Sequence, residues 1–268
     1  MEQFCSIVGC GTVLSCDLIR VGRYTAREAA IIATGFSTVS VTFLLVVART
    51  LGLMDLWTTY FFVSMLVTFI VTALTARIWP LSAIPDTYFM GEKATVPKEE
   101  GSRLERAWKL GLETAAAQPP VLKLCTDNLM SGLKMAFGVI PSITSIGLLG
   151  LFLAEFTPIF DYFGYLFVPF FKLFGVSQAV LAGKAAALSL PEMFLPAILI
   201  KGSGTMLLKF VIAVVSISEI LFFSASIPCI MGTDIPLKMR DIVIIWFERV
   251  VFSIIITISI AIFLGLPD

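Results

Sequence analysis

The chain has 268 residues, of which 58% are hydrophobic and 14% are charged, and its 19 basic residues balance its 19 acidic residues. Soluble domains are typically about 45–50% apolar and about 25% charged, so the composition excludes an ordinary water-soluble domain and predicts an all-α integral membrane protein. The zero net charge gives no basic field for nucleic acid, and the absence of His excludes imidazole-based triads and His metal sites. We expect no nucleic-acid partner, no metal site and no cofactor.

The first part of the chain, residues 1–80, contains two long apolar runs. The run over 29–51 begins after a capping-box pattern, Thr25 followed three residues later by Glu28. The run over 57–79 has Trp at both ends, as is typical of helix ends at a membrane surface. Polar residues interrupt the earlier run within the segment Thr34-Gly35-Phe36-Ser37-Thr38. We therefore predict an interrupted helix followed by a continuous membrane-spanning helix.

Residues 81–136 differ in composition, because charges of both signs are interleaved there. Leu104, Trp108 and Leu112 follow a helix-start pattern and fall on one helical face. We interpret this segment as a polar connector with an amphipathic helix that lies on the membrane surface.

The last part of the chain is again apolar. Residues 137–268 contain runs at 137–156, 162–176, 179–200, 206–227 and 242–264. The run at 162–176 is too short to cross the hydrocarbon core, which needs roughly 20 residues, and is typical of a re-entrant or interfacial helix. In all, the sequence predicts about six to eight helices.

Residues 1–80 and 137–268 resemble each other weakly. Each part contains an interrupted helix followed closely by a Ser/Thr-rich span. Paired interrupted helices in corresponding positions are typical of secondary transporters, whose substrate sites lie near the bilayer midplane. We therefore predict two helical repeats, separated by the connector 81–136.

The strongest local signal surrounds Glu192, where Pro191 and Pro196 interrupt an apolar run after Ser189. Proline breaks a helix, and the freed backbone groups persist at bilayer depth only inside protein or beside a water-filled cavity. A carboxylate in such a place indicates a functional site. Glu192 and Ser189 are candidate substrate-binding residues. The alternative is that Glu192 pairs with Lys184 and only fixes packing.

A second signal lies in the run 206–227, where Ser216 and Glu219 share one helical stripe. Glu219 is near mid-span, where an unpaired charge is strongly unfavourable, and Arg249 in the last run is a candidate partner. Glu219 could form a structural ion pair with Arg249 or act near the substrate, and the sequence does not decide between these two roles. The candidate coupling or supporting residues are Glu219, Ser216, Lys184 and Arg249.

Thr34, Ser37 and Thr38 form a third candidate set, at the interruption of the first helix. Small polar residues allow close helix packing, which is one interpretation. The other is that these three residues bind substrate opposite Glu192.

Three segments carry a resemblance to a known family. They are Gly22-Arg23-Tyr24-Thr25-Ala26-Arg27-Glu28-Ala29, Ala33-Thr34-Gly35-Phe36-Ser37-Thr38-Val39-Ser40 and Leu190-Pro191-Glu192-Met193-Phe194-Leu195-Pro196-Ala197. With these segments and the connector after Trp79-Pro80, the chain resembles the nucleoside-recognition, or Gate, domain membrane proteins and looks closest to their YjiH-like branch. The resemblance covers the chain roughly from Gly9 onward.

The resemblance implies a multi-pass protein of the bacterial inner membrane that moves a small polar solute such as a nucleoside. Gate repeats also occur in concentrative nucleoside transporters, ferrous-iron transport proteins and spore-maturation proteins, and some Gate proteins act in pairs. The alternative is therefore a non-transporting scaffold subunit that assembles with a second Gate-type protein or with another copy of itself. YjiH-like proteins look longer at the N-terminus, so we expect a short form or a fragment.

We predict a membrane transporter, or one component of a transporter, that alternates its access around the interrupted helices. Glu192 would contact the solute or a coupling cation, with Thr34, Ser37 and Thr38 opposite. An intramembrane enzyme would need a carboxylate pair such as Glu192 and Glu219, and nothing in the sequence indicates that these two meet. We therefore predict no catalytic residues and no enzyme activity.

Overall fold

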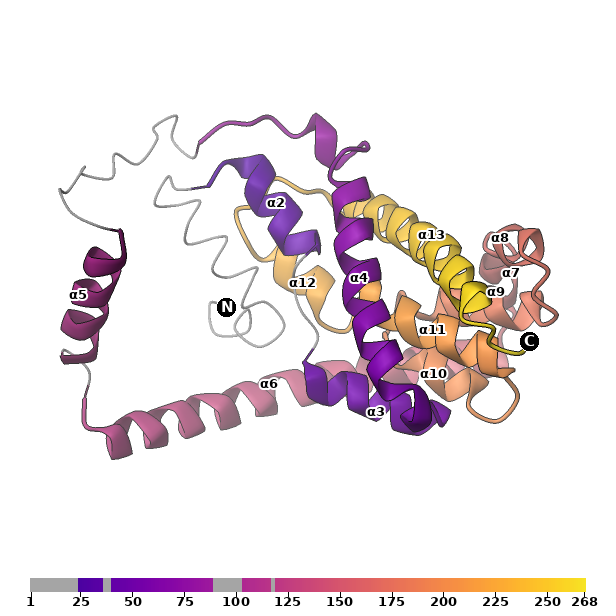
Figure 1. The fold of residues 1–268 in the computed structure, drawn as a ribbon, viewed down its shortest axis with the longest axis horizontal. Helices are drawn as coiled ribbons and strands as arrows, with labels where there is room; N and C mark the ends of the chain where they lie inside the picture. Colours follow the sequence, from indigo (N-terminus) through magenta and orange to yellow (C-terminus); the bar gives the residue numbers. More distant parts are fainter. Residues whose placement is uncertain (1–23, 36–39, 89–102, 117–118) are drawn as a thin grey trace.

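The computed structural model describes residues 24–35, 40–88, 103–116 and 119–268 (Figure 1). Within these ranges the regular secondary structure consists of helices. The only β-type pairing there is an isolated bridge between Thr25 and Tyr88. The predicted all-α class is confirmed. The predicted number of six to eight helices is wrong, because the described ranges alone contain helices α2 to α13 and two short 3₁₀ helices. Apolar runs that we expected to form one helix each are divided at interruptions.

The first part of the described chain contains an interrupted helix and a long helix. Its elements are α2 (Ala26–Gly35), α3 (Val41–Leu51), η2 (Met54–Leu56), α4 (Trp57–Thr75) and η3 (Leu81–Ala83). The expected capping box opens α2, since the Thr25 N–H donates to Glu28 Oε2 at 3.0 Å and the Glu28 N–H donates to Thr25 Oγ1 at 3.2 Å. Helix α2 is described to Gly35, and α3 begins at Val41 after the non-helical Ser40, while residues 36–39 of the predicted interruption lie outside the described residues.

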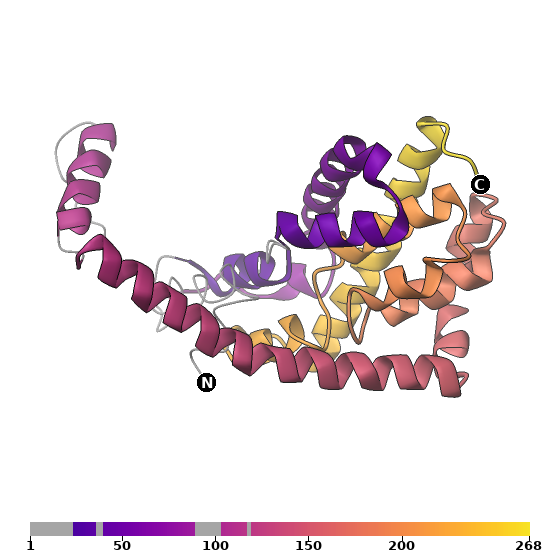
Figure 2. The same ribbon diagram turned by 90° about the horizontal axis from the view of Figure 1, so that it is seen from below.

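Two helices follow the first part, α5 (Arg103–Ala116) and α6 (Val121–Phe156). Helix α6 has 36 residues and continues through the predicted boundary between connector and second repeat at 136/137. The sequence of α6 becomes more apolar toward its C-terminal end, but the helix is continuous. Pro141 lies within the helix and does not end it. Helix α6 reaches the other helices at one end and extends away from them toward α5 (Figures 1 and 2).

The remaining helices are α7 (Ile159–Gly164), α8 (Val168–Leu173), α9 (Ala179–Leu188), α10 (Leu195–Ile200), α11 (Met206–Ser218), α12 (Ser226–Met231) and α13 (Met239–Phe263). The run 162–176, which we expected to form one re-entrant or interfacial helix, is divided between the end of α7 and α8. We expected one continuous helix over 206–227, and this expectation is wrong. Helix α11 ends at Ser218, and residues 219–225 are not helical before α12 begins.

Helices α4, α11 and α13 pack against one another at the centre of the fold (Figure 1). Helices α4 and α13 are antiparallel, because Arg240 at the start of α13 lies over the Trp79 ring while Arg249 contacts Thr72. Almost every residue of α11 from Leu207 to Ser218 is buried, so this helix is surrounded on all sides. Helix α9 packs against α7, α8 and α10.

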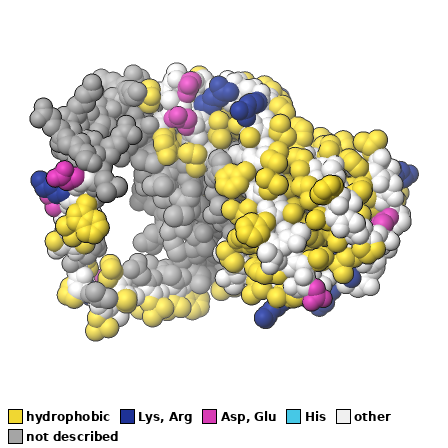
Figure 3. Space-filling model, viewed as in Figure 1, with side chains coloured by type: hydrophobic (Ala, Val, Ile, Leu, Met, Phe, Trp, Pro, Cys, Tyr) yellow, Lys and Arg dark blue, Asp and Glu magenta, His cyan; other side chains and the backbone are white. Residues whose placement is uncertain are grey.

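Among the described residues, two helical segments are long and apolar enough to cross a membrane. They are Met54–Thr75, with 22 residues, and Met239–Phe263, with 25 residues. Many large apolar side chains are exposed on the helices, including Phe62, Leu66 and Phe69 of α4. In Figure 3 hydrophobic side chains cover much of the visible face of the helical body, and charged side chains lie toward its edges.

Helices α7 and α9 approach each other closely at Gly164 and Gly183. A Cβ on Gly183 would lie 2.5 Å from the carbonyl oxygen of Gly164, so a Gly183→Ala substitution forces the helices apart. We expect it to lower the free energy of unfolding by roughly 1–3 kcal/mol, measured by detergent-titrated unfolding in mixed micelles. The control is Gly111→Ala on α5, where a Cβ meets nothing within 4 Å. An equal loss in both variants would contradict this account of the contact.

Candidate functional site

Two non-helical segments meet in the interior of the fold. Residues 189–194 separate α9 from α10, as the two prolines predict, and residues 219–225 separate α11 from α12. The Phe223 N–H donates to the Leu190 carbonyl at 2.8 Å, and the Ser224 N–H donates to the Pro191 carbonyl at 3.0 Å. Buried backbone groups outside helices need such partners. The two segments therefore satisfy each other, and we call them the paired breaks.

Glu219 lies at the first position of the second break and is fully buried. Its Oε2 atom accepts a hydrogen bond from the Trp246 indole N–H at 3.3 Å, whereas its Oε1 atom has no hydrogen-bond partner in the described residues. The Ser189 side chain also hydrogen-bonds this carboxylate, and its hydroxyl lies within hydrogen-bond distance of the Ala186 carbonyl, at 2.7 Å. The site thus contains a carboxylate oxygen that is both buried and unpaired.

Glu192 lies in the first break and is 8% exposed. Its Oε2 atom accepts a long hydrogen bond from the Phe194 N–H at 3.4 Å. Glu192 is close enough to Glu219 for the two carboxylates to interact electrostatically, and neither forms an ion pair in the described part of the chain. The paired breaks therefore bring together two carboxylates whose meeting no sequence pattern predicted.

Arg249 is the predicted partner of Glu219, but it binds mainly the backbone. Its Nε donates to the carbonyls of Ser218 and Glu219 at 3.1 and 3.0 Å, and one terminal nitrogen donates to the Ser218 carbonyl at 2.6 Å. These carbonyls have no partner in α11 because the helix ends there. The guanidinium also lies near the Glu219 carboxylate without forming a salt bridge to it. Arg249 therefore holds the chain that carries Glu219.

The same guanidinium reaches the first part of the chain through Thr72 of α4. One terminal nitrogen of Arg249 donates to Thr72 Oγ1 at 3.1 Å, and this hydroxyl donates to the Gly35 carbonyl at 3.0 Å. Gly35 is the last residue of α2, at the interruption of the first helix. Thr72 was not among the candidate residues that the sequence singled out, so sequence reasoning missed its place in this network. No local pattern marks it, because its partners are distant in the sequence.

The other sequence candidates lie in separate places. The Thr34 hydroxyl is buried and donates to the Ala30 carbonyl of its own helix at 2.8 Å. Ser37 and Thr38 lie outside the described residues. Ser216 is fully buried on α11, and its hydroxyl has no hydrogen-bond partner among the described residues.

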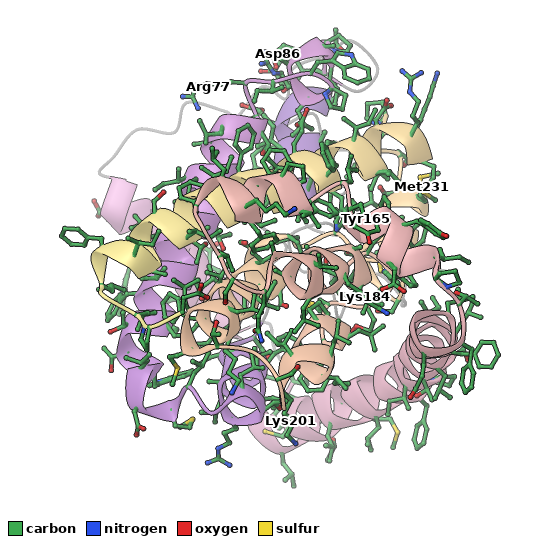
Figure 4. All side chains as sticks on the ribbon, turned by 90° about the vertical axis from the view of Figure 1, so that its right-hand side faces the viewer. Arg77, Asp86, Tyr165, Lys184, Lys201 and Met231 are labelled. Carbon is green, nitrogen blue, oxygen red and sulfur yellow. The ribbon has the colours of Figure 1, made fainter. Side chains whose placement is uncertain are left out.

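Lys184 is paired with a carboxylate other than the one considered from sequence. Its Nζ lies 2.8 Å from Asp161 Oδ1, so α9 is joined to α7 by this ion pair. The alternative in which Lys184 neutralises Glu192 is therefore not what the structure shows. Lys184 lies on the face shown in Figure 4, and its side chain is partly exposed.

The backbone is strained next to Glu219. Ile220 has a φ of 62°, in the left-handed region that β-branched residues rarely adopt. Such strain persists only where surrounding contacts determine the conformation, and it is common at functional sites. Here the Arg249 contacts on one side and the backbone bonds to Leu190 and Pro191 on the other supply those constraints.

An apolar cavity of about 390 Å³ adjoins the paired breaks. Its lining residues are Ile146, Leu149, Gly150, Leu153, Phe160, Phe163, Leu190, Pro191 and Phe223. Gly150 allows α6 to pass close to the first break, since a Cβ there would lie 2.9 to 3.0 Å from Leu195 and Pro191 side-chain atoms. The paired breaks thus contain the carboxylates of Glu192 and Glu219, and an apolar cavity lies beside them. No group of three or more potential metal ligands exists among the described residues.

Comparison with known proteins identifies one similar protein of undetermined function. An uncharacterized protein of Alkalihalophilus pseudofirmus is 35% identical over 273 aligned residues, which cover 97% of this chain and 58% of that protein. The chain therefore spans little more than half the length of the curated relative that it matches. No family model and no solved structure matches the chain. None of these comparisons indicates a function for the chain.

Because Arg249 donates several buried hydrogen bonds, we expect its removal to destabilise the fold. An Arg249→Met substitution keeps much of the side-chain bulk but leaves the buried Ser218 carbonyl at the end of α11 without its donor. We expect it to lower the free energy of unfolding by about 1–3 kcal/mol, the cost of one buried acceptor left unpaired. The matched control is Arg240→Met on the same helix, whose side chain is 75% exposed. A loss of stability that is no larger than in the control would show that the network is not structural.

Proposed function

We propose that this chain is an integral membrane protein and forms all or part of a transporter for a small polar solute, which binds at the paired breaks. The observation that carries the proposal is the meeting of two buried carboxylates, Glu192 and Glu219, where two helices are interrupted. At bilayer depth, irregular backbone is tolerated only inside protein or beside a water-filled cavity, and carboxylates there mark solute or ion pathways.

Exposed side chains support a membrane environment. Besides the two segments of spanning length, the exposed apolar residues of α4 would be unfavourable in water and favourable against lipid. Among the charged residues labelled in Figure 4, Arg77 and Asp86 lie at one end of the helical body and Lys201 at the other, while Lys184, which pairs with Asp161, lies between them. This distribution fits a bilayer that surrounds the middle of α4 and meets water near both ends.

The arrangement of helices supports two related halves. In the first, α2 and α3 flank an interruption and are followed by α4, and in the second, α9 and α10 flank an interruption and are followed by α11. Helix α3 contacts α10, and α4 contacts α11, so corresponding elements meet. Transporters with paired interrupted helices change access by moving one half against the other around a fixed site. The paired breaks are the place where such a site would lie.

A nucleoside is the solute class to test first. Its ribose hydroxyls can donate to carboxylate oxygens such as those of Glu192 and Glu219. Its planar base has an apolar face that fits a space lined by Phe160, Phe163 and Phe223. The resemblance to Gate proteins favours the same class.

Uptake into proteoliposomes tests the proposal directly. The purified chain should accumulate radiolabelled nucleoside, and Glu192→Gln should reduce the initial rate by about tenfold or more, since one charge-assisted hydrogen bond is worth about 1.5–3 kcal/mol. Asp55→Asn, at an exposed carboxylate on η2, is the matched control and should leave uptake unchanged.

Full uptake by the Glu192→Gln variant would remove Glu192 from the mechanism. No uptake by the unaltered chain, together with co-purification of a stoichiometric membrane partner, would favour the scaffold subunit instead. A second Gate-type protein and a second copy of this chain are the partners to look for.

The membrane assignment has its own test on α4. Leu66 is 51% exposed near the centre of the spanning segment, so Leu66→Arg places a charge against lipid. We expect insertion to become less favourable by about 2.5–3.5 kcal/mol, measured as the fraction of chain that resists alkaline extraction from membranes. Thr58→Arg, at an exposed position near the start of α4, is the control. Equal insertion of both variants would indicate that this face meets water.

A further inference from the structure

We propose that Phe163 and Trp246 couple the apolar cavity to the Glu219 carboxylate, so that a solute with a planar aromatic group positions this carboxylate as it binds. Trp246 is then a positioning residue, and Phe163 determines which solutes the site responds to. The inference rests on the proposed function, because it assigns roles to two residues of the same site. Its test nevertheless has a spectroscopic readout that needs no transport.

Trp246 holds the side chain of Glu219. Its indole N–H donates to Glu219 Oε2 at 3.3 Å, and both residues are fully buried. Arg249 lies one turn further along α13 and donates to the Glu219 backbone carbonyl at 3.0 Å. Residues three apart lie on one face of a helix, so α13 holds the backbone of Glu219 with one side chain and the carboxylate with the other. A rotation of the indole would therefore redirect the carboxylate while the backbone stays in place.

Two phenylalanine rings determine the orientation of the Trp246 indole. The Phe163 ring is stacked on it, with 5.8 Å between the ring centroids and an interplanar angle of 22°. The Phe167 ring meets it edge to face, with a centroid distance of 5.7 Å and an angle of 89°. Aromatic pairs favour stacked and edge-to-face arrangements of this kind. The direction of the indole N–H thus depends on where the two phenylalanine rings lie.

Phe163 joins this aromatic cluster to the apolar cavity of about 390 Å³ beside the paired breaks. Of the two rings against Trp246, Phe163 lines the cavity and Phe167 does not. Phe167 is fully buried, whereas Phe163 is only partly buried. Because protein interiors are closely packed, a group that enters the cavity displaces the ring beside it. The displacement reaches Trp246 through the stacked pair and changes where its N–H holds Glu219.

The contact with Phe163 also predicts which part of a solute the site responds to. A planar aromatic base can stack against the Phe163 ring, whereas the sugar of a nucleoside has no aromatic ring. The sugar hydroxyls would bind the carboxylates instead. A nucleoside should therefore move the Trp246 indole, and ribose alone should not.

Fluorine NMR of the full chain in detergent, with 5-fluorotryptophan at its four tryptophan positions, tests the coupling. The Trp246→Phe variant identifies the resonance of residue 246 as the one that disappears. Adenosine should shift this resonance saturably and should not shift those of Trp57, Trp79 and Trp108, none of which lines the cavity. Ribose at the same concentration should shift none of the four.

Two phenylalanines of α7 supply matched variants. Phe163→Leu removes the ring that both lines the cavity and stacks on Trp246, so adenosine should no longer shift the resonance of residue 246. Phe160→Leu removes a ring that lines the same cavity but is not stacked on Trp246, so the shift should persist with a Kd raised roughly twofold to tenfold. Size-exclusion profiles and helical circular dichroism identify variants that fail to fold.

The comparison of adenosine with ribose in the unaltered chain decides the question without any variant. The coupling would be overturned if adenosine left the resonance of residue 246 in place, if ribose shifted it equally, or if Phe163→Leu kept the full shift. Uptake of adenosine that needs Glu192 but occurs without this shift would overturn the coupling and leave the proposed function standing. A saturable shift that depends on Phe163, in a chain that moves no nucleoside, would do the reverse.

Discussion

The buried carbonyl of Ser218 depends on the guanidinium of Arg249 for its hydrogen bonds, and the carbonyl of Glu219 accepts from the same guanidinium and from the Leu221 N–H. A helix end in water is satisfied by solvent, but a helix end in the interior needs an internal donor. Because the guanidinium is a planar fork with several donors, it reaches both carbonyls and also Thr72, which in turn donates to Gly35. One side chain of α13 thereby fixes the ends of α2 and α11, which belong to different halves of the fold.

This constraint determines where the two carboxylates lie. With α11 stopped at Ser218, the chain turns through the strained Ile220 and pairs its backbone with Leu190 and Pro191. Trp246, one helical turn before Arg249, donates to one oxygen of Glu219 and leaves the other oxygen unpaired. Strain, a buried unpaired acceptor and an interrupted helix are each unfavourable, and their concentration at one place is typical of a functional site. Solute or cation binding is the function that would compensate for them.

Local sequence signals predicted the parts of this site that depend on local chemistry. Pro191 and Pro196 predicted the first break because proline interrupts a helix. Glu192 was a candidate because it is a carboxylate within an apolar run. The second break was missed, because residues 219–225 contain neither Gly nor Pro and follow an apolar pattern suited to a helix. Its causes are Arg249 and Trp246, about 30 residues away. The meeting of Glu192 with Glu219 was missed for the same reason, since tertiary contacts alone produce it.

The proposed function requires that position 192 lies at bilayer depth and is reached from water rather than from lipid. Cysteine accessibility in sealed proteoliposomes measures this directly, in a chain whose own five Cys have been replaced. A charged, membrane-impermeant thiol reagent is applied to Glu192→Cys and to Phe62→Cys, the latter on the exposed apolar face of α4. The account predicts that the cysteine at 192 reacts and that the cysteine at 62 does not. An unreactive cysteine at 192 from both sides of the membrane, or equal reaction at both positions, would contradict it.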